Sequence, residues 1–155
     1  MKIRNMKDMP VFDRQRAEVV ARVDRAVIGD DCQLAYLVVD VPERGACMIL
    51  KDDLQIEEES VVIEGWEGIK SYAHGEESSI YEKKIGDSVF DYQGKELGVV
   101  SDFILSPYNM QVWGLEVSSG AILDLLEGRL ELPLEEVAWK SPGSSIANLE
   151  RNDMK

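Results

Sequence analysis

The residues best suited to chemistry in this chain are one histidine, two cysteines and several runs of acidic side chains. His74 sits in the segment AHGEE, where a catalytic or metal-binding imidazole would need a formed pocket and oriented partners. Cys32 and Cys47 have neither CxxC spacing nor a neighbouring histidine, so the pattern indicates no zinc site and no activated nucleophile. We predict that His74 is an exposed linker residue and that both cysteines are reduced thiols.

The acidic runs are Asp30-Asp31, Asp52-Asp53 and Glu57-Glu58-Glu59. They could bind a divalent cation loosely, but no EF-hand loop is present, and solvated surface charge is the simpler interpretation. The chain also contains neither a GxGxxG motif nor a P-loop, so nucleotide binding is not indicated. We therefore predict no catalytic residue, no metal ligand and no cofactor, and hence a protein that is not an enzyme.

The charge of the chain narrows the classes of partner. Its formal net charge is -13 over 155 residues, and an acidic surface repels the phosphates of DNA and RNA. The same charge would suit a basic protein partner, or it could serve solubility alone. The start MKIRNMKDMP lacks the apolar stretch of a secretory signal, and the longest uncharged run, 103–115, is too short to span a bilayer. We expect a cytoplasmic protein with no membrane span.

The main feature of the chain as a whole is an internal repeat. The segments that begin at Val11 and Val89 align without a gap. Identical residues occur at Val11/Val89, Phe12/Phe90, Asp13/Asp91, Gln15/Gln93, Glu18/Glu96, Asp24/Asp102, Gln33/Gln111, Leu37/Leu115 and Val39/Val117. Such a repeat predicts two similar small domains in tandem. We place them at 1–64 and 85–147, with a linker over 65–84 and a flexible tail over 148–155.

Turn residues and β-favouring stretches predict mostly strands. In the second copy the predicted strands cover 88–90, 96–105, 111–117, 130–132, 135–139 and 145–149. The segment 121–126 fits a helical turn or a strand equally well. The later segments ILKDDL and LPLEEV align out of phase with the rest, which predicts an insertion in the second copy around Gly120–Gly128.

One strand of the first copy is apolar on both faces. Leu34, Tyr36 and Val38 share the face that holds Gly114 and Glu116 in the second copy. A strand of this kind is usually covered on both sides, so we predict a cover from the other domain, another subunit or a loop of the same domain. Of the tryptophans, Trp113 is explained by core packing, whereas Trp66 and Trp139 could be interface anchors or buried structural residues. The candidate interface residues are Leu34, Tyr36, Val38, Trp66 and Trp139.

The stretch SVFDYQGKELGVVSDFILSPYNMQVWGLEV, followed by GRLELPLEEV, resembles a PRC-barrel domain. The matching positions are Gly94, Gly98, Asp102, Gly128, Leu132, Pro133 and Leu134. The first copy matches less well, because it lacks the two glycines and the proline. The resemblance implies an all-β fold of two small, mostly antiparallel PRC-barrel-like β-barrels in tandem.

The resemblance also implies a function. PRC-barrels occur in the photosynthetic reaction centre H subunit, in a ribosome maturation factor and in small stand-alone proteins, where they resemble protein-binding modules. We therefore expect a non-catalytic interaction or scaffold module that binds proteins through sheet edges and the apolar face near Tyr36, with a homo-oligomer left open. One alternative is a ribosome-assembly or RNA-processing accessory that holds a basic ribosomal protein. Another is a metal-binding protein or enzyme that uses the Asp/Glu runs.

Overall fold

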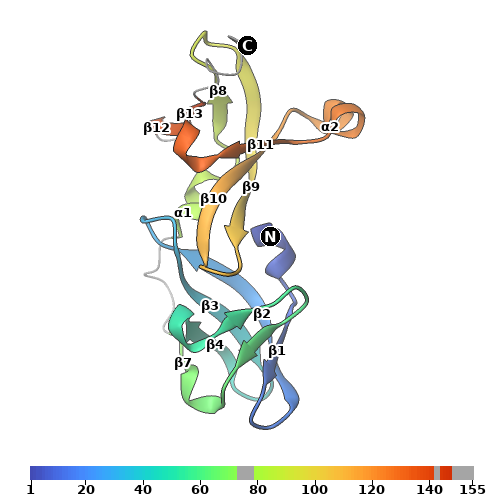
Figure 1. Cartoon of the computed structure of the whole chain (residues 1–155), viewed down its shortest axis with the longest axis vertical. Coiled ribbons are helices and arrows are strands. Elements are labelled where there is room, and N and C mark those ends of the chain that lie inside the picture. The colour runs from blue at the N-terminus through green and yellow to red at the C-terminus, as the bar shows by residue number, and fades with distance from the viewer. Residues whose placement is uncertain (73–78, 142–143, 148–155) are drawn as a thin grey trace. The chain divides into compact units, whose positions relative to one another are not determined.

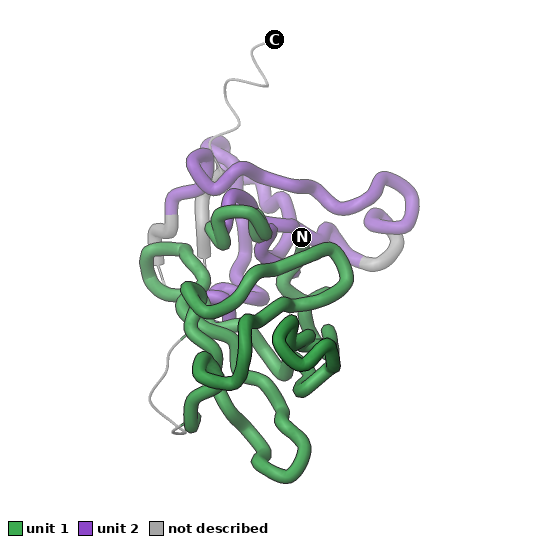
Figure 2. Tube along the Cα trace, turned by 60° about the horizontal axis from the view of Figure 1, so that its bottom comes forward, with its two compact units in different colours: residues 1–80, 105–111 green, residues 81–104, 112–155 purple. Residues whose placement is uncertain are grey.

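The computed structural model describes residues 1–72, 79–141 and 144–147, which form two compact units (Figure 1, Figure 2). Unit 1 consists of Met1–Ile80 together with Leu105–Gln111, and unit 2 consists of Tyr81–Ile104 together with Val112–Lys155. Strands make up most of the regular structure, so the prediction of an all-β fold is confirmed. Every helix in the described part of the chain is too short or too polar to reach across a bilayer.

The first sheet has seven strands in the order β5-β6-β1-β2-β3-β4-β7. The strands are β1 (Pro10–Asp13), β2 (Glu18–Ile28), β3 (Leu34–Val41), β4 (Gly45–Leu50), β5 (Gln55–Ile56), β6 (Val61–Ile63) and β7 (Ile69–Ser71). The 3-10 helices η1 (Ile3–Met6), η2 (Lys51–Asp53) and η3 (Trp66–Gly68) accompany them. Two of these elements, η3 and β7, lie in the stretch predicted as a linker, and β7 pairs with β4.

The second sheet has six strands in the order β11-β10-β9-β8-β13-β12. The strands are β8 (Ser88–Phe90), β9 (Glu96–Ser106), β10 (Gln111–Ser118), β11 (Leu130–Pro133), β12 (Val137–Ser141) and β13 (Ser144–Ala147). The helical elements are α1 (Ile80–Lys84), α2 (Ala121–Glu127) and η4 (Leu134–Glu136). Pairing among the described residues closes neither sheet into a barrel.

The two sheets follow the same strand plan. The order from β5 to β4 in the first sheet corresponds to the order from β12 to β11 in the second. Each sheet contains a parallel pair at the same place, β1 with β6 and β8 with β13. The register also shifts at matching positions, between Val11 and Phe12 and between Val89 and Phe90. The repeat in the sequence thus corresponds to a repeat in topology.

The repeated residues form the core of each unit. Val11, Leu37 and Val39 are fully buried in unit 1, and so are their counterparts Val89, Leu115 and Val117 in unit 2. Alternation along a strand directs these side chains to one face of the sheet. Burying a side chain of this size contributes about 1.5–3 kcal/mol. The same buried positions therefore stabilise both sheets.

The repeated aspartates explain another part of the sequence identity. Asp13 Oδ1 accepts hydrogen bonds from the backbone N–H of Gln15 at 2.9 Å and of Gly65 at 3.1 Å. Asp91 Oδ1 accepts from the N–H groups of Gln93 and Lys95, both at 2.9 Å. An Asp that accepts from the N–H two residues on forms an Asx turn, which ends β1 and β8 in the same way.

The predicted insertion in the second copy is confirmed. In the first copy only residues 42–44 connect β3 to β4, whereas residues 119–129, which include α2, connect β10 to β11. The segment 121–126, for which periodicity did not distinguish helix from strand, is helical. Gly120 and Gly128 at its two ends have φ values of 108° and 77°, which glycine adopts readily.

The expectation that core packing explains Trp113 is wrong, because 45% of this residue is exposed. It shares a strand face with Leu115 and Val117, which are fully buried. Alternation assigns a residue to a face, but it does not say how far along the strand the core extends. On this face of β10 the core includes Leu115 and Val117 but does not reach Trp113.

Candidate functional site

Helix α2 presents large apolar side chains to solvent. Leu125 is 86% exposed, Leu126 is 74% exposed and Leu123 is 47% exposed. In Figure 1 the helix projects as an arm from the ends of β10 and β11. Exposed apolar side chains gathered on one element are typical of an interaction site rather than of a stabilising core.

A cleft of about 740 Å³ adjoins α2, between this helix and the first residues of β9. Leu97 and Val99 of β9 line it together with Leu123 and Leu130. Glu96 and Glu127 also line it. We use the term α2 surface for the apolar side chains of the helix and the cleft, which are Leu97, Val99, Leu123, Leu125, Leu126 and Leu130.

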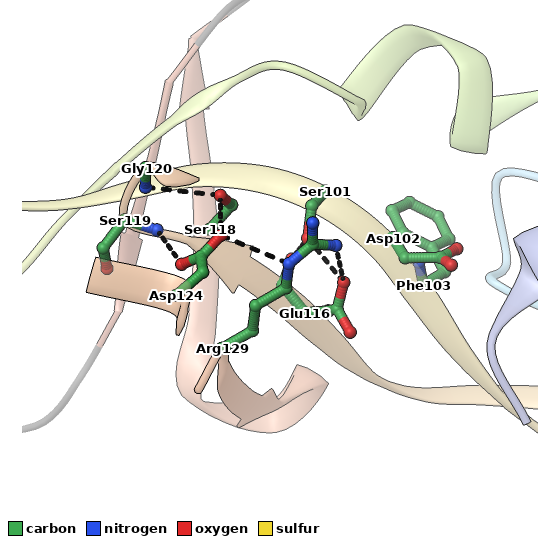
Figure 3. A network of polar contacts seen from close by, with 9 residues as sticks. All are labelled: Ser101, Asp102, Phe103, Glu116, Ser118, Ser119, Gly120, Asp124 and Arg129. Carbon is green, nitrogen blue, oxygen red and sulfur yellow. Dashed lines mark hydrogen bonds and ion pairs between the residues drawn. The ribbon is translucent and has the colours of Figure 1, made fainter. Parts of the chain in front are cut away.

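A polar network fixes α2 to the end of β10 (Figure 3). Asp124 of the helix accepts a hydrogen bond from Ser118 Oγ at 2.5 Å and another from the backbone N–H of Ser119 at 2.9 Å. Its Oδ2 atom also accepts from Arg129 Nε at 3.2 Å. These bonds connect the helix to the end of β10 and to Arg129.

Arg129 continues the network into the sheet. Its Nη1 atom lies 2.7 Å from Glu116 Oε1, and Glu116 is fully buried in β10. Ser101 Oγ of β9 donates a second hydrogen bond to the same carboxylate oxygen at 2.8 Å. A buried carboxylate is costly unless it is paired and hydrogen-bonded, and here it has both kinds of partner. Arg129 therefore connects Asp124 on the helix to Glu116 within the sheet.

The network favours the ionised form of Asp124. The hydrogen bond from Ser118 lowers the pKa of Asp124 most, and the N–H of Ser119 and the charge of Arg129 lower it further. A carboxylate with a lowered pKa is a weak base, and an acceptor already engaged by three donors is poorly placed to take a proton from a substrate. The arrangement is suited to positioning a surface.

Replacing Ser118 by alanine is expected to raise the pKa of Asp124 toward the usual carboxylate range, because it removes the main cause of the lowering. A lowered folded-state pKa contributes stability above the pKa of the unfolded chain, and that contribution is lost as the pH falls through the folded value. NMR titration of the Asp124 side-chain carbon in both proteins measures this. An unchanged titration curve in the Ser118→Ala protein would contradict the assigned role of the hydroxyl group.

The glycines and the aspartate of the sequence motif support the backbone beside this network. Gly98 has a φ of 143°, and a Cβ at this position would lie 2.1 Å from the backbone oxygen of Ser118. Gly128 ends α2 with a φ of 77°. Asp102 is fully buried, and its Oδ1 accepts from the N–H of Phe103 at 2.8 Å (Figure 3). Of these residues, Gly98 permits the close approach of β9 to Ser118 at the end of β10.

The residues predicted as an interface in the first copy lie in different surroundings. Leu34 and Val38 are buried, at 0% and 1% exposure, and Tyr36 is half-buried with its ring centre 6.4 Å from that of Tyr72. Tyr72 belongs to the same unit, and its hydroxyl group is hydrogen-bonded to Arg25. A cover from the same unit thus lies beside Tyr36, and use of this face by a partner stays a prediction.

The two tryptophans of the predicted interface differ in what the structure describes. Trp66 is half-buried, and its ring lies 5.0 Å from the guanidinium carbon of Arg16 and 5.6 Å from that of Arg44. Such distances are typical of cation–π contacts. Trp139 belongs to β12, where it pairs with Ser145, but its side chain lies outside the described part. Their use as interface anchors stays a prediction.

The residues first considered for chemistry remain dispersed. Cys32 is half-buried, and burial, followed by the charges of Asp31 and Asp30, raises the pKa of its thiol, which favours the unreactive protonated form. Cys47 is buried and free. Within the described ranges, no three His, Cys, Asp or Glu side chains gather as metal ligands would. His74 lies outside the described residues.

Sequence reasoning did not identify the α2 surface or the Glu116–Arg129 pair. The signal for the surface was present, because the predicted insertion contains the leucine-rich run AILDLLE. The signal for the ion pair was weaker, because Glu116 stood out only as a polar residue in an otherwise apolar strand. Its partner, Arg129, is separated from it by the inserted helix.

Unit 2 is a small module built mainly of strands. Its first strand, β8, pairs in parallel with its last, β13, and Gly98 lets β9 approach the end of β10. Residues 77–150 match the sequence model of the PRC-barrel domain family. The resemblance of this part of the chain to a PRC-barrel domain is therefore confirmed. The comparison with curated proteins found no match. That the first copy is also PRC-barrel-like stays a prediction, supported by the shared strand order.

Proposed function

We propose that this protein is a non-catalytic interaction module that binds another protein through the α2 surface of its PRC-barrel domain. The observation that carries the proposal is the exposure of Leu125 and Leu126, at 86% and 74%, on a helix inserted into the repeated strand plan. Packing within the unit gives no reason for two adjacent leucines to face water. A partner that covers them would gain about 1.5–3 kcal/mol for each leucine it buries.

The way the helix is held supports the same proposal. Binding requires ordering of the interface, and a surface that is already positioned loses less entropy when its partner arrives. Asp124 and Arg129 fix α2 through bonds to Ser118, Ser119 and Glu116. The first copy has a short turn in place of this helix, so the inserted arm distinguishes the PRC-barrel domain from its repeat.

Replacing Leu125 by glutamate is expected to reduce recovery of the partner at least about tenfold, because truncation at the centre of an interface commonly costs 2 kcal/mol or more. The stability of the protein itself should change by less than about 0.5 kcal/mol, because the side chain is exposed. The measurement is cross-linking in cells with a photoreactive residue at position 126, followed by quantification of the adduct.

Tyr108→Glu is the matched control. Tyr108 is 97% exposed, so the variant introduces the same charge at an equally accessible apolar residue of unit 1. We expect one discrete adduct that decreases in Leu125→Glu and persists in Tyr108→Glu. Equal adduct in both variants, or equal loss in both, would refute docking at the α2 surface.

A further inference from the structure

The cleft beside α2 also indicates the chemistry of its occupant. We propose that the α2 surface binds a segment of another protein in which apolar residues alternate with lysine or arginine. This inference rests on the proposed docking function and adds to it the class of partner. It is carried by the apolar lining of the cleft, by the unbalanced carboxylates around it and by the charge of the helix.

The lining of the cleft accounts for the apolar part of the segment. Leu97, Val99 and Leu130 are contributed by β9 and β11, and Leu123 faces them from α2. The cleft has a volume of about 740 Å³ and is open to solvent, so a peptide could place apolar side chains in it while the rest of the peptide stays outside. Leu125 and Leu126 extend the apolar surface along the helix beyond the cleft.

The carboxylates around the cleft account for the basic part. Glu96 and Glu127 line the cleft, and both are exposed. Among the described residues neither carboxylate has an ion-pair partner. The guanidinium of Arg129 is shared by Glu116 and Asp124, so Lys95 is the remaining cation of the lining. A segment carrying lysine or arginine would supply positive charge to balance the carboxylates of Glu96 and Glu127.

The same charges argue against a second copy of this chain as the occupant. Helix α2 carries Asp124 and Glu127 and no basic residue, so two α2 surfaces brought together would set carboxylate against carboxylate. The net charge of -13 adds repulsion between whole molecules. A basic partner would instead be attracted by this field and would arrive faster at low ionic strength.

The test uses the full-length protein and three synthetic peptides of equal length with leucine at the same positions. The remaining positions are lysine in one peptide, glutamine in the second and glutamate in the third. Fluorescence anisotropy is expected to show that the lysine peptide binds at least about fivefold more tightly than the glutamine peptide. The glutamate peptide should show no measurable binding. The preference for lysine should shrink as salt is raised, since exposed charges are screened.

Two double variants separate a local from a global charge effect. Glu96→Gln with Glu127→Gln should weaken binding of the lysine peptide by roughly fivefold, as expected for the loss of two exposed ion pairs. Glu43→Gln with Glu59→Gln removes the same charge from exposed residues of unit 1 and should change the affinity less than about twofold. Equal losses in the two variants would show attraction to the overall charge and would overturn the inference.

Other outcomes are equally decisive. Equal binding of the lysine and glutamine peptides that is lost in Leu125→Glu would overturn the basic-segment inference and leave the docking function standing. Binding of the lysine peptide that survives Leu125→Glu would place it elsewhere and overturn the inference. Absence of binding by every peptide would overturn it too. Sedimentation velocity that shows self-association lost in Leu125→Glu would identify a second copy as the occupant and would also overturn it.

Discussion

Replacing Gly98 by alanine is expected to lower the free energy of unfolding by at least about 3 kcal/mol, the largest effect we predict for a single added methyl group. The new Cβ would lie 2.1 Å from the backbone oxygen of Ser118 and 2.8 Å from its carbonyl carbon. Both atoms are backbone, so no side-chain rotation can relieve the overlap. The φ of 143° adds strain, because residues with a side chain rarely adopt it.

Gly94→Ala is the control that separates the two causes. Gly94 also has a positive φ, 84°, but a Cβ there would meet no atom within 4 Å. Alanine at this position should therefore cost only about 1 kcal/mol, which reflects the backbone conformation alone. Urea unfolding followed by circular dichroism measures both changes. Similar losses in the two variants would mean that the close approach of β9 to Ser118 is unimportant.

Removal of Arg129 is expected to have the next largest effect. Arg129→Ala removes the ion-pair partner of the fully buried Glu116, whereas the hydrogen bond from Ser101 remains. Removing one partner of a buried ion pair commonly costs about 3–5 kcal/mol. The side chain of Arg129 is 40% exposed, so water screens part of the interaction. We therefore expect a loss of about 2–3 kcal/mol in the free energy of unfolding, measured by urea denaturation.

The first copy suggests the variant that should recover this loss. Val38 occupies the position in the repeat that corresponds to Glu116, and it is 1% exposed. Combining Arg129→Ala with Glu116→Val replaces the ion pair by an apolar residue, which is often neutral or stabilising. The double variant should be more stable than Arg129→Ala alone, while cross-linking through position 126 should remain reduced because α2 has lost its anchor. A double variant as unstable as the single one would contradict this account.

The stability of these variants bears directly on function. If the double variant is stable but binds poorly, the main role of the Glu116–Arg129 ion pair is to position α2, and the pair is not needed for folding. Buried ion pairs often contribute little net stability, so a positional role is a reasonable explanation for this one.

The positions of strands in the second copy could be predicted from the sequence because they depend on local signals. Strands were expected over 96–105 and 111–117, and they occur as β9 (Glu96–Ser106) and β10 (Gln111–Ser118). Turn residues set their ends, and side-chain alternation sets their faces. The position of the insertion could also be predicted, because an insertion shifts the alignment of two copies within one chain.

The candidate site could be predicted only in part. The leucines of α2 were visible, but periodicity over a short apolar run does not distinguish a helix from a strand or a buried face from an exposed one. The proposed interface residues Leu34 and Val38 are buried, whereas Trp113, expected in the core, is half-exposed. In each case the sequence showed which residues share a strand face, but it did not show whether other parts of the protein cover that face.

The sequence alone predicted one β unit used twice, because identical residues recur at a constant spacing, and the two sheets share a strand order that agrees with this prediction. Such a prediction is possible because the forces that form strands and turns act between near neighbours. Only the tertiary structure decided that Glu116 is a buried ion-pair partner, that Gly98 lies against Ser118 and that α2 exposes its leucines. Burial and pairing depend on which distant segments meet, and the local pattern of side chains does not record that information.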